Sequence, residues 1–195
     1  LCLSGHINYR GMYEIALGPT LRDVMDKLGG GVPGGRKVKV LQTGGPLGGV
    51  LSADKLDTPL DFEAMASAGA ILGSGGIIYG DDTVCAVDLT RLLIAFCQFE
   101  SCGKCFPCRL GMTHLLDVIE RIRAYQGQPD DLDLLRKYGS AMQAGSLCGH
   151  GQLGFNPVQS ALNFFMEDFR VHLEEKKCPT GSCDNMVARP TRTRP

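Results

Sequence analysis

Residues 100–111 read Glu-Ser-Cys-Gly-Lys-Cys-Phe-Pro-Cys-Arg-Leu-Gly, which places Cys102, Cys105 and Cys108 at a spacing of three. An α-helix has 3.6 residues per turn, so three thiolates at this spacing do not line up along one helix face and are expected in a loop. A loop that curls around a compact soft cation or a metal cluster brings all three sulfurs to one side. This spacing is typical of the iron–sulfur loops of ferredoxins.

A fourth thiolate has to come from elsewhere in the chain, because residues 109–112 contain no cysteine. The best candidate is Cys148, in the glycine-rich stretch Gly-Ser-Leu-Cys-Gly-His-Gly of residues 145–151. Glycines beside a cysteine let the backbone approach a cluster closely and aim its N–H groups at the sulfurs. We therefore predict a [4Fe-4S] cluster on four cysteines: Cys102, Cys105, Cys108 and Cys148.

Two other uses of these cysteines remain open. Four cysteines can bind zinc, but such sites usually combine two Cys-x2-Cys pairs, and no second pair surrounds Cys148. Disulfides need an oxidising compartment, and cysteines three residues apart in a tight loop pair poorly with each other. The spacing favours an iron–sulfur cluster over both.

The composition narrows the class of protein. The 195 residues carry a formal net charge of −1, which argues against nucleic acid as a general partner, and no stretch approaches the ~20 apolar residues of a membrane span. Nine cysteines without a secretory signal indicate a reducing compartment and metal binding. We expect a cytoplasmic protein, or one bound peripherally on the cytoplasmic side of a membrane complex. The chain begins at Leu1 without an initiator Met, so we expect a piece of a longer protein.

The first part of the chain reads as short strands around one helix. The expected elements are a hairpin of 3–7 with 12–17, a helix capped by Thr20, a strand over 37–42, a short helix over 59–67 and a second hairpin of 77–79 with 83–87. This order suits a β-grasp, ubiquitin-like domain over residues 1–87. Cys2 and Cys85 stand in apolar, strand-like settings and are interpreted as packing residues.

From residue 88 the apolar periodicity becomes helical. Asp88 is the expected cap of a first helix, which places Leu89, Leu92, Leu93 and Phe96 inward. Three more helices are expected over 109–123, 131–143 and 156–177, the last starting at Asn156-Pro157. Residues 88–177 are therefore predicted to form a four-helix bundle with the cluster at one end, and the fold class of the whole is α+β.

A second metal site is a further hypothesis. His172, Cys178 and Cys183 follow one another at spacings of six and five, and Cys97 could complete a zinc site with them. The alternative is that His172 lies on the solvent face of its helix and the two thiols are free. Residues 178–195 are expected to comprise a Cys-Pro loop and a flexible, basic tail from residue 184 onward.

The stretch 100–111 strongly resembles the iron–sulfur signature of the family of NADH-oxidising flavoprotein subunits. This family includes the 51 kDa subunit of respiratory complex I and the diaphorase subunits of NAD-dependent hydrogenases and formate dehydrogenases. Residues 3–13, Leu-Ser-Gly-His-Ile-Asn-Tyr-Arg-Gly-Met-Tyr, are similar to the start of its soluble-ligand-binding β-grasp domain, and 72–78, Leu-Gly-Ser-Gly-Gly-Ile-Ile, to a strand entry of the family. The likeness covers residues 3–177. Ser-Leu-Cys-Gly-His-Gly at 146–151 differs from the complex I form and favours the formate dehydrogenase or hydrogenase branch.

The resemblance implies an oxidoreductase subunit whose FMN- and NADH-binding domain precedes the β-grasp part and does not lie within these 195 residues. It implies a cluster that relays electrons between FMN and a thioredoxin-like [2Fe-2S] partner subunit, in a complex with a larger iron–sulfur subunit. This piece should neither bind NADH tightly nor oxidise it alone, and no catalytic residue is expected in it.

Three functions compete on this basis. The first is an electron-transfer module of an NAD-linked oxidoreductase. The second is a zinc-stabilised protein-interaction domain without a redox role. The third is a thiol redox sensor that uses Cys102, Cys105 and Cys108. Visible absorption distinguishes the first from the other two.

Overall fold

The computed structural model of the chain describes residues 1–184. These residues belong to two compact units, Leu1–Val84 and a second unit that begins at Cys85. The tail predicted to be flexible lies outside the described residues from position 185 onward. None of the helices formed by residues 1–184 has the length and apolar character to cross a membrane.

The first unit is built on a five-stranded mixed sheet of order β2-β1-β5-β3-β4. The strands β1 and β5 pair in parallel at its centre, and the other neighbours are antiparallel. The predicted first hairpin corresponds to β1 and β2, whereas β4 was not predicted because its three residues are too few to show alternation. The strands are β1 (Cys2–Gly5), β2 (Gly11–Met12), β3 (Val38–Thr43), β4 (Val50–Ser52) and β5 (Gly76–Asp81).

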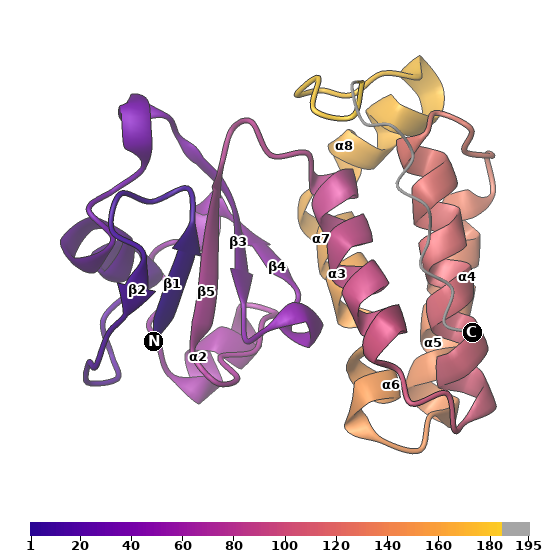
Figure 1. Ribbon diagram of the computed structural model, residues 1–195, viewed down its shortest axis with the longest axis horizontal. Helices are drawn as coiled ribbons and strands as arrows, with labels where there is room; N and C mark the ends of the chain where they lie inside the picture. Colours follow the sequence, from indigo (N-terminus) through magenta and orange to yellow (C-terminus); the bar gives the residue numbers. More distant parts are fainter. Residues whose placement is uncertain (185–195) are drawn as a thin grey trace. The chain divides into compact units, whose positions relative to one another are not determined.

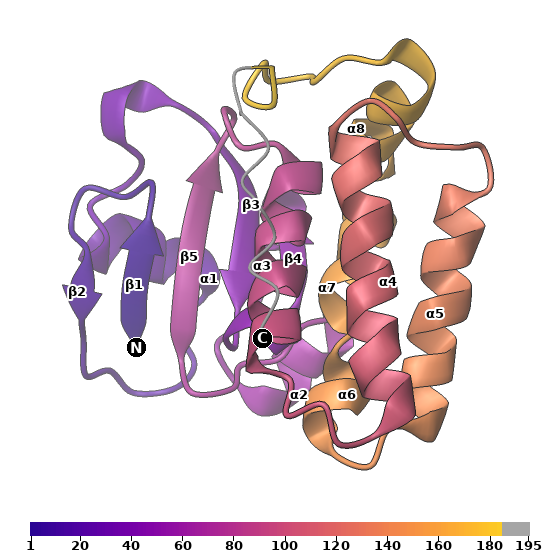
Figure 2. The same ribbon diagram turned by 45° about the vertical axis from the view of Figure 1, so that its right-hand side comes forward.

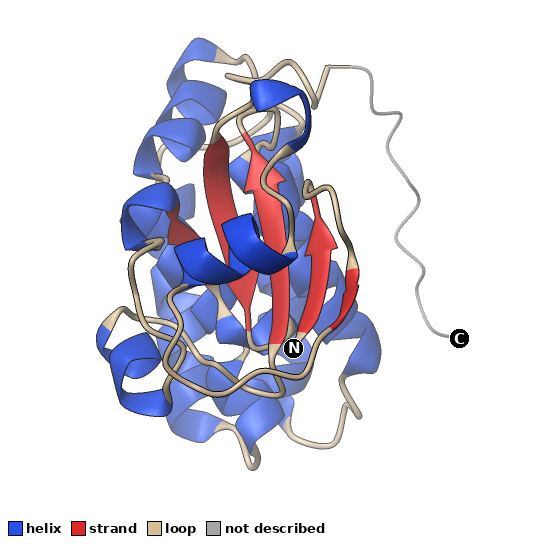
Figure 3. Cartoon of the chain, turned by 90° about the vertical axis from the view of Figure 1, so that its left-hand side faces the viewer, coloured by secondary structure: helices blue, strands red, loops and turns tan. Residues whose placement is uncertain are grey.

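The predicted helix after Thr20 lies against this sheet. It begins as α1 (Leu21–Asp23) and continues as a wider turn, η1 (Val24–Leu28). Thr20 and Asp23 form a reciprocal capping box, and the buried Tyr79 hydroxyl on β5 donates to the Leu21 carbonyl at 2.8 Å. Figure 3 shows helical turns crossing the face of the sheet. The remaining short elements are η2 (Pro33–Gly35), η3 (Pro46–Gly48), η4 (Ala53–Lys55) and α2 (Phe62–Ser67).

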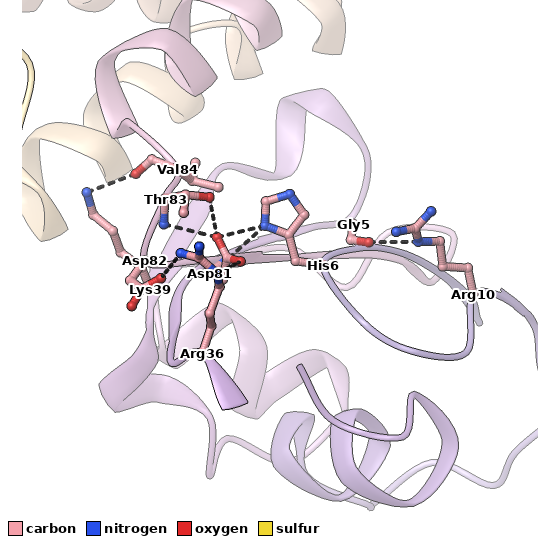
Figure 4. A network of polar contacts seen from close by, with 9 residues as sticks. All are labelled: Gly5, His6, Arg10, Arg36, Lys39, Asp81, Asp82, Thr83 and Val84. Carbon is pink, nitrogen blue, oxygen red and sulfur yellow. Dashed lines mark hydrogen bonds and ion pairs between the residues drawn. The ribbon is translucent and has the colours of Figure 1, made fainter. Parts of the chain in front are cut away.

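The prediction of a second hairpin around residues 80–82 was wrong. Asp81 ends β5, and its carboxylate accepts hydrogen bonds from the Thr83 N–H at 3.0 Å and from the Thr83 hydroxyl (Figure 4). This Asx-type turn stops the chain from folding back as a strand. His6 Nδ1 lies 2.9 Å from Asp81 Oδ1, and Arg36 pairs with Asp82 at 3.2 Å, so the turn is fixed to neighbouring segments.

Replacing Asp81 with alanine is expected to destabilise the first unit by about 1–3 kcal/mol, because the Thr83 N–H and hydroxyl lose their acceptor. Asp82→Ala is the matched control: Asp82 is exposed and pairs with the half-exposed Arg36, an arrangement worth at most ~1 kcal/mol. Calorimetric unfolding of the whole chain measures both. Equal losses in the two variants would contradict this account of the turn.

The second unit is helical. Helix α3 packs against α4 and α7, and α4 packs against α5. Figures 1 and 2 show α3, α4 and α5 as neighbouring long helices, with α6 at the end where α3 gives way to α4. The helices are α3 (Ala86–Glu100), α4 (Phe106–Arg123), α5 (Asp131–Gly145), α6 (Gly149–Leu153), α7 (Asn156–Phe164), α8 (Met166–Arg170) and the wider turn η5 (Val171–Glu175).

The last predicted helix, 156–177, is interrupted rather than continuous. Phe165 has φ −132° and ψ 32°, outside the helical region, which separates α7 from α8. Phe165 and Phe169 are nevertheless both buried. The break at Phe165 therefore interrupts the helix but leaves these two apolar side chains buried.

The start of α3 also differs from the prediction. The helix begins two residues before Asp88, with Cys85 at the cap position, and the Ala86 N–H donates to the Asp168 carboxylate at 2.9 Å. Asp88 is buried in the first turn and pairs with Arg91 at 3.0 Å and Arg123 at 2.6 Å. The predicted inward face is therefore correct only in part: Leu93 is buried, but Leu92 and Phe96 are 47% and 52% exposed. Val87, Ile94 and Cys97 are buried instead.

Candidate metal centres

The three cysteines of the 100–111 stretch lie around the start of α4. Cys102 is exposed in the loop after α3, and Cys105 occupies the cap position of α4. Cys108 is buried, in the first turn of α4 rather than before it as predicted. Cys148, 40 residues further on, occupies the corresponding cap position of α6 and is exposed.

The two loops meet at Cys105. The backbone N–H groups of Leu147 and Cys108 hydrogen bond to its sulfur and lower the pKa of the Cys105 thiol. Burial raises the pKa of Cys108, and the neighbouring Cys105, Cys148 and Cys102 raise it further by repulsion between like charges. Cys108 is therefore close enough to the other three cysteines for their charge to affect it.

The packing around these thiols has the close approach that a cluster site needs. A Cβ atom on Gly151 would lie 2.4 Å from Ser146 Oγ and 2.9 Å from Cys108 Cβ, so only glycine fits there. A Cβ atom on Gly145 would likewise lie 2.9 Å from Cγ of the Pro107 ring. Ser146 Oγ is buried and, among the described residues, has no hydrogen-bond partner. Close glycine packing beside Cys108 and a buried, unpaired hydroxyl fit an iron–sulfur cluster, whose sulfurs accept hydrogen bonds.

Helix α6 is also fixed to the end of α3. His150 Nε2 lies 2.9 Å from the Cys97 carbonyl oxygen, which places the Cys148 loop beside the start of the 100–111 stretch. The Cys97 side chain is buried in α3, and burial raises the pKa of its thiol to about 12. Cys97 therefore packs as a neutral thiol in the helical core.

A second group of potential ligands lies at the other end of α3. The ligand atoms of four buried residues are all within 4.8 Å of one another: Cys85, His172, Cys178 and Cys183. Three of these residues were predicted as zinc ligands. The fourth member is Cys85, interpreted from the sequence as a packing residue, whereas the predicted Cys97 does not belong to the group. His172 is fully buried, so the alternative that it lies on a solvent face is excluded.

The orientation of His172 suits a metal ligand. Its Nδ1 lies 2.7 Å from the Asp168 carbonyl oxygen, which can only accept, so Nδ1 carries the proton and the Nε2 lone pair faces the cysteines. Nε2 is 3.6 Å from Cys85 Sγ. Metal-bound histidines commonly donate their other ring N–H to a backbone carbonyl in this way. The Tyr125 ring packs over His172, with ring centroids 5.6 Å apart.

The cysteines of this group are poised to lose protons. A hydrogen bond from Cys85 lowers the pKa of Cys183 to about 5, and the same bond raises the pKa of the donor thiol Cys85. Burial opposes ionisation of Cys178, but hydrogen bonds led by the Thr180 hydroxyl at 3.3 Å outweigh it and lower the pKa of Cys178. Thiolates buried at such close spacing are stabilised by a cation.

The two groups are separated by the length of α3. Cys85 caps the helix at its start and Ser101 at its end, and its 15 residues at ~1.5 Å each give about 22 Å. The two centres are therefore distinct sites.

Comparison with known proteins identifies the helical unit. Residues 88–172 match the family described as the NADH-ubiquinone oxidoreductase-F iron-sulfur binding region. The region includes all four cysteines Cys102, Cys105, Cys108 and Cys148. The predicted resemblance of the helical unit to the iron–sulfur region of the NADH-oxidising flavoprotein subunits is thereby confirmed.

Relatives extend the likeness to both units. The chain is 38% identical over 185 residues to the NADP-reducing hydrogenase subunit HndC of Solidesulfovibrio fructosivorans. It is 36% identical over 178 residues to one of the NADH-quinone oxidoreductase subunits of Rhizobium meliloti. These matches cover 95% and 91% of this chain but 38% and 42% of the relatives, so the chain spans about two fifths of their length.

A solved structure shares the architecture. A chain in the crystal structure of an NAD+-reducing [NiFe]-hydrogenase in the H2-reduced state matches with a TM-score of 0.77 and 31% identity. The match covers 89% of this chain and 29% of the hydrogenase chain. The mixed sheet followed by a helical unit is therefore an arrangement found in that enzyme.

Proposed function

We propose that the chain is an electron-transfer module that holds a [4Fe-4S] cluster on Cys102, Cys105, Cys108 and Cys148. The observation that carries this proposal is the close packing of the two cysteine loops, in which a Cβ on Gly151 of the second loop would lie 2.9 Å from the Cβ of Cys108. The match of residues 88–172 to an iron-sulfur binding region supports it independently.

The chain's own residues have separate tasks at this site. The start of α4 carries Cys105 at its cap and Cys108 in its first turn, where the positive end of the helix dipole stabilises thiolate charge. Gly145 and Gly151 allow the two loops to pack without a gap, and the His150 contact with the Cys97 carbonyl holds α6 in place. A bound [4Fe-4S] cluster would supply a one-electron carrier.

In the complete protein we assign FMN and NAD(H) to a part outside these 195 residues. The partners we propose are a thioredoxin-like [2Fe-2S] subunit and a larger iron–sulfur subunit, and we favour the hydrogenase or formate dehydrogenase branch over complex I. The hydrogenase subunit HndC and the NAD+-reducing hydrogenase structure support this branch. The free thiols among the described residues suit a reducing compartment, so we propose a cytoplasmic location.

At the level of the fold, we propose a β-grasp domain over residues 1–87 followed by a four-helix bundle over 88–177. The parallel pairing of β1 with β5 and the helix across the sheet support the first assignment. The packing of α3 against α4 and α7, with α5 against α4, supports the second.

For the second centre we propose zinc. Three cysteines and one histidine are a common structural zinc set, and a tetrahedral site with bonds of ~2.0–2.3 Å needs ligand atoms within about 4 Å of one another. The group of Cys85, His172, Cys178 and Cys183, all within 4.8 Å, comes close to that spacing. The ion would join the start of α3, the end of the last helical segment and the loop after it. If the chain binds zinc but no iron–sulfur cluster, the alternative function is a zinc-stabilised protein-interaction domain without a redox role.

The relay role is tested by electron transfer from the chain. The chain is purified without oxygen, reduced with dithionite, freed of excess reductant and mixed with an oxidised [2Fe-2S] ferredoxin. We expect the ferredoxin to become reduced while the broad absorption of the chain near ~400 nm recovers. The Cys148→Ala variant is the control, and we expect no transfer from it. A chain that binds zinc but no iron, or that transfers no electrons, would overturn the proposal.

A further inference from the structure

Two serines occupy equivalent places beside the four cysteines. Ser101 is the residue directly after α3, and Ser146 is the residue directly after α5. Each leads into a cysteine loop, ahead of Cys102 and Cys148 respectively. Neither serine is a ligand in the proposed site, so their side chains are available for another role.

The contacts of Ser101 define the direction of its hydroxyl proton. Ser101 Oγ accepts a hydrogen bond from the Gly103 N–H at 3.2 Å and lies 3.4 Å from Cys108 Sγ. A metal-bound cysteine is a thiolate and has no proton to donate, so the Ser101 hydroxyl has to be the donor in this pair. Ser101 lowers the pKa of Cys108 accordingly, against the effect of burial.

Ser146 reaches the site from the second loop. It is 6% exposed, and its Oγ has no hydrogen-bond partner among the described residues. Its Oγ lies 2.4 Å from the place where a Cβ on Gly151 would stand, and that place is itself 2.9 Å from Cys108 Cβ. A buried hydroxyl without a partner costs about 1–3 kcal/mol, unless an acceptor such as a cluster sulfur completes the site.

From this geometry we infer that Ser101 and Ser146 are positioning residues that donate hydrogen bonds to the sulfurs of the cluster and raise its reduction potential. The inference rests on the proposed [4Fe-4S] site. Reduction adds negative charge to a cluster and its thiolates, and donors aimed at the sulfurs stabilise the reduced state more than the oxidised state.

The test is a redox titration of the cluster in the whole chain, followed by electron paramagnetic resonance of the reduced state. Ser101→Ala and Ser146→Ala are each expected to retain iron and to shift the midpoint potential to more negative values, and the double variant is expected to shift it further. Ser101→Thr, which keeps the hydroxyl, is expected to restore the original potential.

Ser160→Ala is the matched control. Ser160 is also 6% exposed, but its hydroxyl donates to the Asn156 carbonyl within α7 at 2.7 Å. Its removal should leave the potential unchanged. An unchanged potential in both Ser101→Ala and Ser146→Ala, with the cluster intact, would overturn the inference while leaving the proposed function standing. A chain without any iron–sulfur signal would overturn the proposed function itself.

Discussion

Replacement of Cys148 with alanine is expected to abolish the iron–sulfur absorption of the chain and to reduce its iron content from about four atoms per chain to a small fraction of that value. Three cysteines would remain in the first loop, but the second loop would then supply no thiolate. The second loop adjoins the first, since a Cβ on Gly151 would lie 2.9 Å from the Cβ of Cys108. Iron and acid-labile sulfide assays on anaerobically purified protein measure the effect.

Two other cysteines provide controls for this variant. Cys2 is exposed at the start of β1, in the first unit, and Cys97 is buried in α3 with a raised pKa. Cys2→Ala should retain full iron, and Cys97→Ala should retain it when the helix remains folded. Retention of four irons by Cys148→Ala would show that the fourth ligand lies elsewhere and would contradict the assignment of the two loops.

Replacement of Cys85 with alanine is expected to remove the zinc, reducing it from about one ion per chain to near zero, and to lower the thermal midpoint of the second unit. The metal ligands join the start of α3 to the segment that carries His172, Cys178 and Cys183. Loss of a structural ion leaves buried thiolates without a cation, so destabilisation is expected beyond the loss of one side chain.

The Cys97→Ala variant distinguishes the two assignments for the fourth ligand. Cys97 was the candidate from sequence, whereas Cys85 belongs to the observed group, so Cys97→Ala should keep its zinc. Elemental analysis of both variants, with thermal unfolding in the presence and absence of a chelator, provides the comparison. Full zinc in Cys85→Ala combined with loss in Cys97→Ala would contradict the structure.

The prediction of the cluster cysteines rests on local spacing. A single loop is enough to bring three cysteines at a spacing of three to one side of a cluster. The glycines around Cys148 indicate that the backbone there can approach a cluster closely, and neither inference requires knowledge of the fold. The contribution of Cys85 was not predictable in this way. It lies 87 residues before His172, and the apolar run of 83–87 reads as a strand. Only the Asx-type turn at Asp81, which ends β5, shows that Cys85 is the cap of a helix.

The helical unit shows the same division between local and tertiary information. The periodicity of residues 109–123 predicted the helix α4 correctly, apart from its start at Phe106, because an amphipathic helix shows its pattern locally. The face of α3 was predicted only in part, because the sequence favours Asp88 as an exposed cap, whereas ion pairs with Arg91 and Arg123 bury it. A charged residue inside a helix reveals its partners only when the neighbouring helix is placed.

The most direct test of a cluster held between the two cysteine loops is a single sample of the unsubstituted chain, purified without oxygen. Iron, sulfide and zinc are assayed on it, and the dithionite-reduced protein is examined by electron paramagnetic resonance. The account predicts about four irons and four sulfides per chain, about one zinc, and the signal of a reduced [4Fe-4S] cluster. A colourless protein that contains zinc but neither iron nor sulfide would contradict it.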